Sequence, residues 1–159
     1  MRVKTIVDET FQDYKKPSML IGTISCTWKC LKELGLDISI CQNCELAKAK
    51  TINIDDLTIV NRYLSNPITS AIVFGGLEPI LQLDEVISLI EKFREKTEDD
   101  IVIYTGYYHD EIMTELLKLK QYKNIVVKFG RFIPNRPSKF DDVLGIELIS
   151  DNQYAIKIS

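Results

Sequence analysis

All four cysteines of this chain fall within one short stretch, as Cys26, Cys30, Cys41 and Cys44. Thiolates that lie this close in sequence bind a soft metal ion or an iron–sulfur cluster, or they pair as disulfides. The two pairs, Cys26-x3-Cys30 and Cys41-x2-Cys44, also suit a structural zinc ion with four cysteine ligands. The cysteine spacing by itself therefore leaves several kinds of site open.

The composition is that of an ordinary globular domain and narrows these alternatives. Of the 159 residues, 45% are hydrophobic and 27% are charged, and the net charge of −3 gives no indication of nucleic acid or an anionic membrane as a partner. No apolar run approaches the ~20 residues of a membrane span, and the N-terminus lacks the apolar core of a signal peptide. We therefore expect a cytoplasmic protein, in which stable disulfides are rare and clustered cysteines bind a metal.

Short apolar runs alternate with helical patterns along the middle of the chain. The apolar runs predict buried strands at residues 18–24, 69–74, 100–104 and 124–128. Apolar residues at helical spacing predict helices at about 54–65, from about Asp84 onward, and around Ile112 to Leu119. Such alternation calls for a mostly parallel sheet with right-handed βαβ crossovers, so the predicted fold class is α/β.

The two ends of the chain fall outside this alternation. Residues 3–15 show loose helical spacing, which ends before Pro17. After Gly130, short strands are predicted at about 143–149 and 154–158. We predict a single domain over residues 1–159, divided into a leading segment 1–17, a βα core 18–130 and a C-terminal extension 131–159.

Three segments follow the ends of predicted strands. The cysteine stretch follows the first strand, Gly75 and Gly76 end the second, and Thr105 and Gly106 end the third. Ligands of parallel sheets bind beyond the carboxyl ends of the strands, and glycine lets the backbone approach a ligand closely. We expect the three segments to line one site.

The order of these segments resembles that of the radical SAM enzymes, with a cysteine loop after the first strand and Gly75-Gly76-Leu77-Glu78-Pro79 after the second. Ile103–Tyr107 resembles the Thr-Gly-Tyr segment of the small activating enzymes of this superfamily. The C-terminal part resembles the activases of anaerobic ribonucleoside-triphosphate reductases, at Phe129–Ile133, Leu144-Gly145 and Ser150–Gln153. This resemblance covers most of the chain. It implies a truncated, or partial, βα barrel of the radical SAM type.

The resemblance implies that three thiols hold a [4Fe–4S] cluster, those of Cys26, Cys30 and Cys41. The family pattern is Cys-x3-Cys-x2-Cys, and here an insert at residues 31–40 displaces the third cysteine. The family also places a hydrophobic residue before that cysteine, and Ile40 stands before Cys41. Cys44, which follows a polar asparagine, is the less favoured ligand.

The resemblance also implies a reaction. The cluster binds S-adenosylmethionine (SAM) at its fourth iron, a flavodoxin-like donor supplies an electron, and a 5′-deoxyadenosyl radical takes a hydrogen from a glycine of the anaerobic ribonucleotide reductase. The backbone carbonyls of Gly75 and Gly76 receive the methionyl ammonium, Glu78 braces the turn, and Thr105 reaches the carboxylate or the ribose. The implied cofactor-binding residues are Ile40, Gly75, Gly76, Glu78, Thr105 and Gly106.

Two alternatives remain at this point. One is a zinc-stabilised α/β interaction module without catalysis, held together by the four cysteines. The other is a radical SAM enzyme that acts on a different substrate. The sequence does not indicate the role of the insert.

Overall fold

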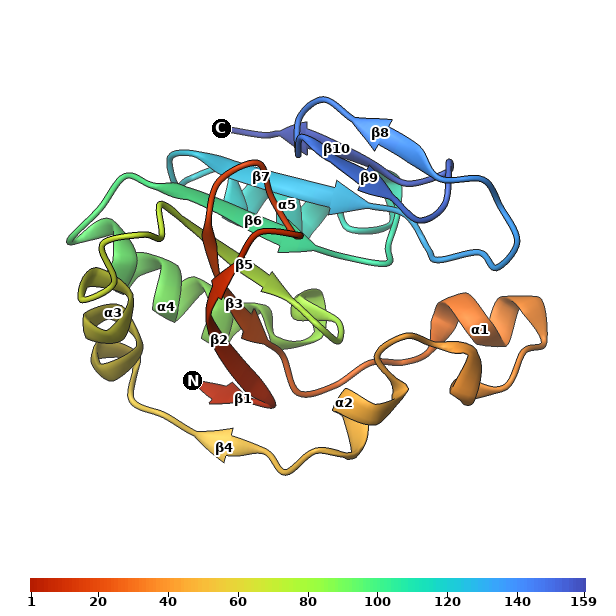
Figure 1. The fold of residues 1–159 in the computed structure, drawn as a ribbon, viewed down its shortest axis with the longest axis horizontal. Helices are drawn as coiled ribbons and strands as arrows, with labels where there is room; N and C mark the ends of the chain where they lie inside the picture. The colour runs from red at the N-terminus through yellow and green to blue at the C-terminus, as the bar shows by residue number, and fades with distance from the viewer.

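The computed structural model describes all 159 residues and contains one six-stranded sheet, in the order β10-β7-β6-β5-β3-β2 (Figure 1). Its strands are β2 (Thr5–Thr10), β3 (Ser18–Gly22), β5 (Ala71–Gly75), β6 (Asp100–Tyr104), β7 (Ile125–Phe129) and β10 (Tyr154–Lys157). The four middle strands are parallel, while β2 and β10 pair antiparallel at the two ends. The predicted α/β class with a mostly parallel sheet is therefore confirmed.

Three helices connect the parallel strands, at α3 (Asp56–Leu64), α4 (Leu83–Arg94) and α5 (Met113–Leu119). The Asp55 carboxylate caps α3 by accepting a hydrogen bond of 3.1 Å from the backbone N–H of Thr58. In α4, acidic residues occupy the first turn and basic residues the last, as the helix dipole favours. The predicted helices thus lie where the apolar spacing placed them.

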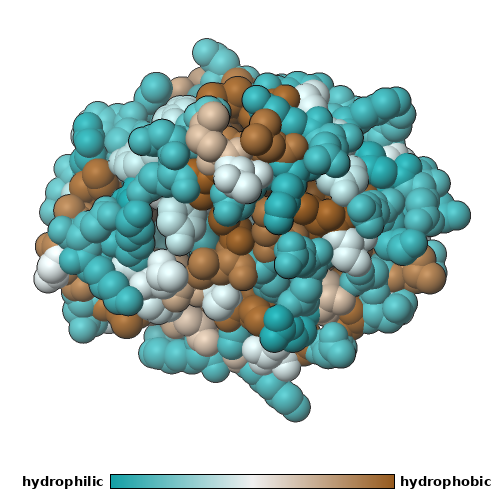
Figure 2. Space-filling model, turned by 180° about the vertical axis from the view of Figure 1, so that it is seen from behind, coloured by the Kyte–Doolittle hydropathy of each residue, from teal (hydrophilic) through white to brown (hydrophobic).

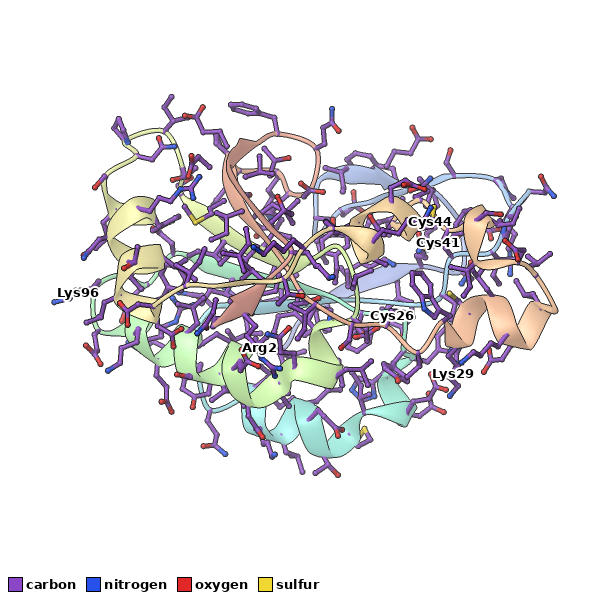
Figure 3. All side chains as sticks on the ribbon, turned by 90° about the horizontal axis from the view of Figure 1, so that it is seen from below. Arg2, Cys26, Lys29, Cys41, Cys44 and Lys96 are labelled. Carbon is purple, nitrogen blue, oxygen red and sulfur yellow. The ribbon has the colours of Figure 1, made fainter.

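The larger core lies between these helices and one face of the sheet (Figure 3). Alternation along β5 sends Ile72 and Phe74 to this face, where they pack with helix residues such as Phe93. Each of these three side chains is fully buried, and such burial stabilises the fold by about 1.5–3 kcal/mol per side chain.

A smaller core covers the opposite face of the sheet. It consists of short strand side chains together with Leu144 and Leu148 from a C-terminal hairpin of β8 (Lys139–Asp141) and β9 (Ile146–Leu148). The buried Asp141 carboxylate fastens this hairpin, because it accepts hydrogen bonds of 2.9 Å from the backbone N–H groups of Leu144 and Ala155.

The leading segment differs from its prediction. It forms two strands instead of a helical turn: β1 (Arg2–Val3), which pairs with β4 (Ile52–Asn53), and β2, which pairs with β3. The residues Thr5, Ile6 and Val7 are β-branched, and β-branched side chains favour a pleated edge strand over a helix. The helical interpretation of residues 3–15 was therefore wrong.

The cysteine stretch contains short helices that the sequence did not indicate: α1 (Lys29–Leu34), the 3₁₀ turn η1 (Ile38–Ile40) and α2 (Cys44–Lys48). Two further 3₁₀ turns are η2 (Pro79–Gln82) and η3 (His109–Glu111). The insert thus gives the stretch an ordered structure of its own.

The surface opposite the view of Figure 1 is mostly hydrophilic, and hydrophobic residues gather in patches across its upper and central part (Figure 2). None of the helices has the length and apolar character needed to cross a membrane.

Candidate metal centre

The cysteine stretch lies beyond the carboxyl ends of the parallel strands. It leaves the end of β3 and carries α1 and α2 past the arrowheads of β5, β6 and β7 (Figure 1). Cys26, Cys41 and Cys44 lie at this end of the molecule together with Lys29, whereas Lys96 lies at the opposite end (Figure 3). This is the end at which parallel sheets bind their ligands.

A cavity of about 440 Å³ opens at this end of the sheet. It brings together eight of the predicted site residues, namely Cys26, Cys30, Cys41, Gly75, Gly76, Glu78, Thr105 and Gly106. The segments that follow three different strands therefore line one cavity, although they are far apart in the sequence.

Two predicted site residues do not line this cavity. Ile40 is 46% exposed and lines a separate hollow with Leu34, Leu36 and Ile133. The Cys44 sulfur faces the Ser39 carbonyl oxygen at 3.8 Å and a Glu45 carboxylate oxygen at 3.7 Å. Ile40 and Cys44 thus lie outside the lining of the cavity that the other three thiols share.

The thiols within the cavity have a different environment from that of Cys44. The backbone N–H of Trp28 donates to the Cys26 sulfur at 3.3 Å, and the backbone N–H of Asn43 donates to the Cys41 sulfur at 3.4 Å. Burial raises the pKa of Cys26 to about 11, and burial also raises the pKa of Cys30. N–H donors of this kind stabilise thiolate sulfur and influence the potential of a bound cluster.

The Gly75–Gly76 turn packs directly against the cysteine stretch. Gly76 has φ of +78°, and a Cβ atom there would lie 2.6 Å from a methyl group of Leu46 in α2. The Gly75 carbonyl accepts hydrogen bonds from both the N–H (3.0 Å) and the hydroxyl (3.1 Å) of Thr23. Those two bonds use both lone pairs of the Gly75 carbonyl, so it already has its full number of hydrogen bonds within the chain.

Glu78 connects the turns after β5 and β6. Its carboxylate accepts hydrogen bonds from the backbone N–H of Gly106 at 2.8 Å and that of Ile80 at 3.1 Å. The Glu78 backbone N–H in turn donates to the Ser25 carbonyl at 2.9 Å, next to the first cysteine. Burial raises the pKa of Glu78, and these bonds oppose that shift. Glu78 therefore braces the cavity wall.

The cavity also contains two polar residues that the sequence did not single out. Lys128 in β7 is 7% exposed, and its ammonium donates to the Gly130 carbonyl at 3.0 Å. Burial lowers the pKa of Lys128 to about 8. Gln153 is 4% exposed, and its side-chain oxygen has no hydrogen-bond partner. Lys128 follows a run of apolar residues in its strand, and a charged residue in that position was the signal that could have marked it as a site residue.

The donor set fits an iron–sulfur cluster better than a single metal ion. Three of the four thiols, those of Cys26, Cys30 and Cys41, line the cavity, and the fourth, that of Cys44, does not. A zinc ion needs four ligands within about 2.3 Å, whereas a cubane cluster accepts thiolates that are spread around its corners. Three cysteines around one cavity suit the second arrangement.

Comparison with known proteins supports this interpretation. A family model described as a 4Fe-4S single cluster domain matches residues 25–153, which is most of the chain and includes all four cysteines. Searches of curated proteins and of solved structures found no match. The chain therefore belongs to the family of 4Fe-4S single cluster domains, a type of domain that is typical of radical SAM activases.

Proposed function

We propose that this chain is a radical SAM activating enzyme that installs a glycyl radical on an anaerobic ribonucleoside-triphosphate reductase. In this proposal Cys26, Cys30 and Cys41 hold the [4Fe–4S] cluster and leave one iron open to SAM. The observation that carries the proposal is the single cavity that these thiols share with the turns at Gly76 and Thr105. The overall chemistry follows from the family.

A cluster held by Cys26, Cys30 and Cys41 would supply one-electron chemistry, the electron coming from an external donor and serving the reductive cleavage of a carbon–sulfur bond of SAM. The chain itself binds and orients SAM and keeps water away. Apolar side chains in the cavity wall support the exclusion of water, among them Trp28, Leu77, Phe132 and Leu148.

Three polar groups of the cavity fit the methionyl part of SAM. No protein donor bonds the Gly76 carbonyl, unlike that of Gly75, so the Gly76 carbonyl is available for the ammonium. The Lys128 ammonium supplies the positive charge that a buried carboxylate needs. The Thr105 hydroxyl lines the cavity, accepts a bond of 3.0 Å from the Tyr107 N–H and lies beside the Glu78 carboxylate, where a ligand oxygen can compete for its proton.

The reductase is proposed as the partner because the segments that resemble reductase activases contribute to the cavity wall. Phe129–Ile133 supplies Gly130 and Phe132, and Ser150–Gln153 supplies Gln153. A glycine-bearing loop of the reductase would approach the mouth of this cavity. A flavodoxin-like protein is proposed as the electron donor.

The proposal is tested with protein that is reconstituted with iron and sulfide under anaerobic conditions. Dithionite and SAM should yield methionine and 5′-deoxyadenosine in equal amounts, and the Cys30→Ala variant should yield neither. A fully reconstituted protein that leaves SAM intact would contradict the radical SAM assignment.

The choice of partner is tested separately. Incubation of the reconstituted protein with an anaerobic ribonucleotide reductase, SAM and reductant should give the electron paramagnetic resonance doublet of a glycyl radical. The matched control is a reductase in which the radical-bearing glycine is replaced by alanine. SAM cleavage without any glycyl radical would refute this partner while leaving the radical SAM chemistry in place.

A further inference from the structure

A cluster of four charged side chains connects α1, which carries Cys30, to the rest of the fold. Arg131 follows β7 and is buried, Glu111 lies in η3, and Lys29 and Glu33 lie on α1. Arg131 donates to both carboxylate oxygens of Glu111, at 2.8 and 2.6 Å. This paired geometry is the strongest form of an arginine–carboxylate contact.

The same guanidinium also contacts α1. One terminal nitrogen donates to Glu33 at 3.1 Å, and the Arg131 Nε lies 2.7 Å from the other Glu33 oxygen as an ion pair without hydrogen-bond geometry. The Lys29 ammonium adds a contact of 2.5 Å to Glu111. Arg131 thus contacts the carboxylates of both Glu111 and Glu33. Residues near both ends of α1, Lys29 and Glu33, take part in this charged cluster.

Arg131 is itself held firmly in place. Its guanidinium carbon lies 4.8 Å above the centre of the Tyr108 ring, and its backbone carbonyl accepts a bond of 2.8 Å from the Asn152 side chain. The Asn152 amide also donates to the Tyr108 hydroxyl at 3.2 Å. These contacts leave the guanidinium little freedom, so it can serve as a fixed attachment point.

The helix α1 has few apolar contacts that hold it against the rest of the fold. Between residues 24 and 50, Leu31 is the only buried residue. Leu31 is thus the one buried apolar anchor of α1, and the other attachments of this helix are ionic. The contact from Arg131 to Glu33 holds α1 alongside the contact from Lys29 to Glu111.

We propose that Arg131 is a positioning residue that fixes α1 through Glu33 and so holds the Cys30 thiol at the cavity. The statement that Cys30 is thereby placed as a cluster ligand rests on the proposed function. The statement that Arg131 fixes α1 does not, because it can be tested on the protein without a cluster.

The first experiment compares Glu33→Gln with Lys32→Gln, its neighbour on α1, since the ion pairs of α1 involve Lys29 and Glu33 and not Lys32. Hydrogen exchange is measured in the cluster-free protein for the α1 amides of Lys32, Gly35 and Leu36, whose bonds close the helix. Glu33→Gln should speed their exchange at least tenfold and leave the β5 and β6 amides unchanged. Lys32→Gln should change neither. Equal exchange in the two variants would overturn the proposal.

The second experiment asks whether Arg131 acts on α1 through Glu33. Arg131→Gln should speed the exchange of the same amides. The double variant with Glu33→Gln should exchange no faster than Arg131→Gln alone, because both changes remove the same contact, that between Arg131 and Glu33. Arg131→Lys keeps the charge but not the planar fork, and it should restore only part of the protection. Effects that simply multiply in the double variant, or full rescue by lysine, would contradict the positioning role.

The consequence for the cluster is measured as the rate of iron loss from reconstituted protein to an excess of chelator. Glu33→Gln should lose iron several times faster than Lys32→Gln. If the exchange result holds but reconstituted protein fails to cleave SAM, the proposed function fails and the anchoring of α1 stands. If iron loss is equal while exchange differs, α1 is anchored but Cys30 is not positioned by it, and the proposal is overturned.

Discussion

Cys41 and Cys44 stand close together in the sequence, yet their sulfurs have different neighbours. The Cys41 sulfur accepts the Asn43 N–H and lines the cavity with Cys26. The Cys44 sulfur lies against two oxygen atoms instead, the Ser39 carbonyl and a Glu45 carboxylate, and does not line the cavity. These environments support Cys41 as the third ligand.

The first prediction follows from this difference. Cys44→Ala should keep about four irons per chain after reconstitution, whereas Cys41→Ala should lose most of its iron and sulfide. Iron and sulfide analysis with electron paramagnetic resonance of the reduced protein measures both. Loss of the cluster in Cys44→Ala with retention in Cys41→Ala would reverse the ligand assignment.

The second prediction concerns Lys128. If its ammonium meets the SAM carboxylate, Lys128→Met should weaken SAM binding by about tenfold or more, which is about 1.4 kcal/mol. Equilibrium dialysis of SAM against reconstituted protein measures the affinity. Lys157→Met on the neighbouring strand β10 is the matched control, because Lys157 is exposed and outside the cavity. Unchanged affinity in a Lys128→Met protein with full iron content would remove this role.

The sequence identified the cysteines and the glycine turn as a site because each forms a short motif at the end of a strand. It missed Lys128 and Gln153 for a physical reason. Whether a polar side chain faces a cavity depends on the pleat of its strand and on what covers that face. The covering hairpin and β10 come from the far end of the chain.

At the scale of elements, the contact between α2 and the Gly75–Gly76 turn determines how close the cysteine stretch lies to the sheet. Gly76 has a left-handed backbone, and Leu46 occupies the space that its Cβ would take. Gly35, which ends α1, also has a positive φ of +63°, but it faces open space. A side chain at Gly35 would meet only backbone strain, whereas one at Gly76 would meet both backbone strain and crowding by Leu46.

The third prediction uses this pair. Gly35→Ala should lower the free energy of unfolding by about 1–2 kcal/mol, the cost of a left-handed alanine. Gly76→Ala should cost more, because the added methyl group also meets Leu46. Urea unfolding of the cluster-free protein measures both, and Leu46→Ala combined with Gly76→Ala should remove the excess. Equal costs for the two glycines would show that the packing of α2 on the turn is loose.

The fourth prediction concerns the pH dependence of the connection between η3 and Arg131. Hydrogen bonds from Arg131 hold the pKa of Glu111 at about 2, below its ordinary value of 4.5. The stability from this lowered pKa is therefore present above pH 4.5 and is lost as the pH falls from 4.5 toward 2. Since Glu111 is partly exposed, the loss should be about 1 kcal/mol.

Urea unfolding of the wild type and of Glu111→Gln between about pH 6 and pH 3 measures this loss. The difference in unfolding free energy between the two proteins should shrink as the pH falls. A difference that stays constant over this range would mean that Glu111 has an ordinary pKa in the folded protein.

For the whole molecule, the alternation of apolar runs and helical patterns was sufficient to predict the four parallel strands and the three helices between them. The strand in the leading segment was not predictable in this way, because β2 is a strand only through its pairing with β3. Of the two strands predicted near the C-terminus, 154–158 matches β10 and 143–149 contains β9, whereas β8 was not predicted. The place of β8 depends on the Asp141 carboxylate, which accepts a hydrogen bond from the backbone of Ala155 in β10. Contacts between distant segments determine β2 and β8, and local patterns carry little information about them.

The sheet and its covering layers together explain where the chemistry lies. Helices fill one face of the sheet and the C-terminal hairpin covers the other, while the cavity lies at the carboxyl ends of the strands. The central claim is that three thiols there hold a cluster whose remaining iron binds SAM. The whole account depends on that open iron.

The most direct test is electron–nuclear double resonance of the reduced, reconstituted protein with SAM that is isotopically labelled in its amino and carboxylate groups. We predict hyperfine coupling from both labels to the cluster in the wild type and in Cys44→Ala. The absence of coupling from either label, in protein with a full complement of iron and sulfide, would contradict the claim.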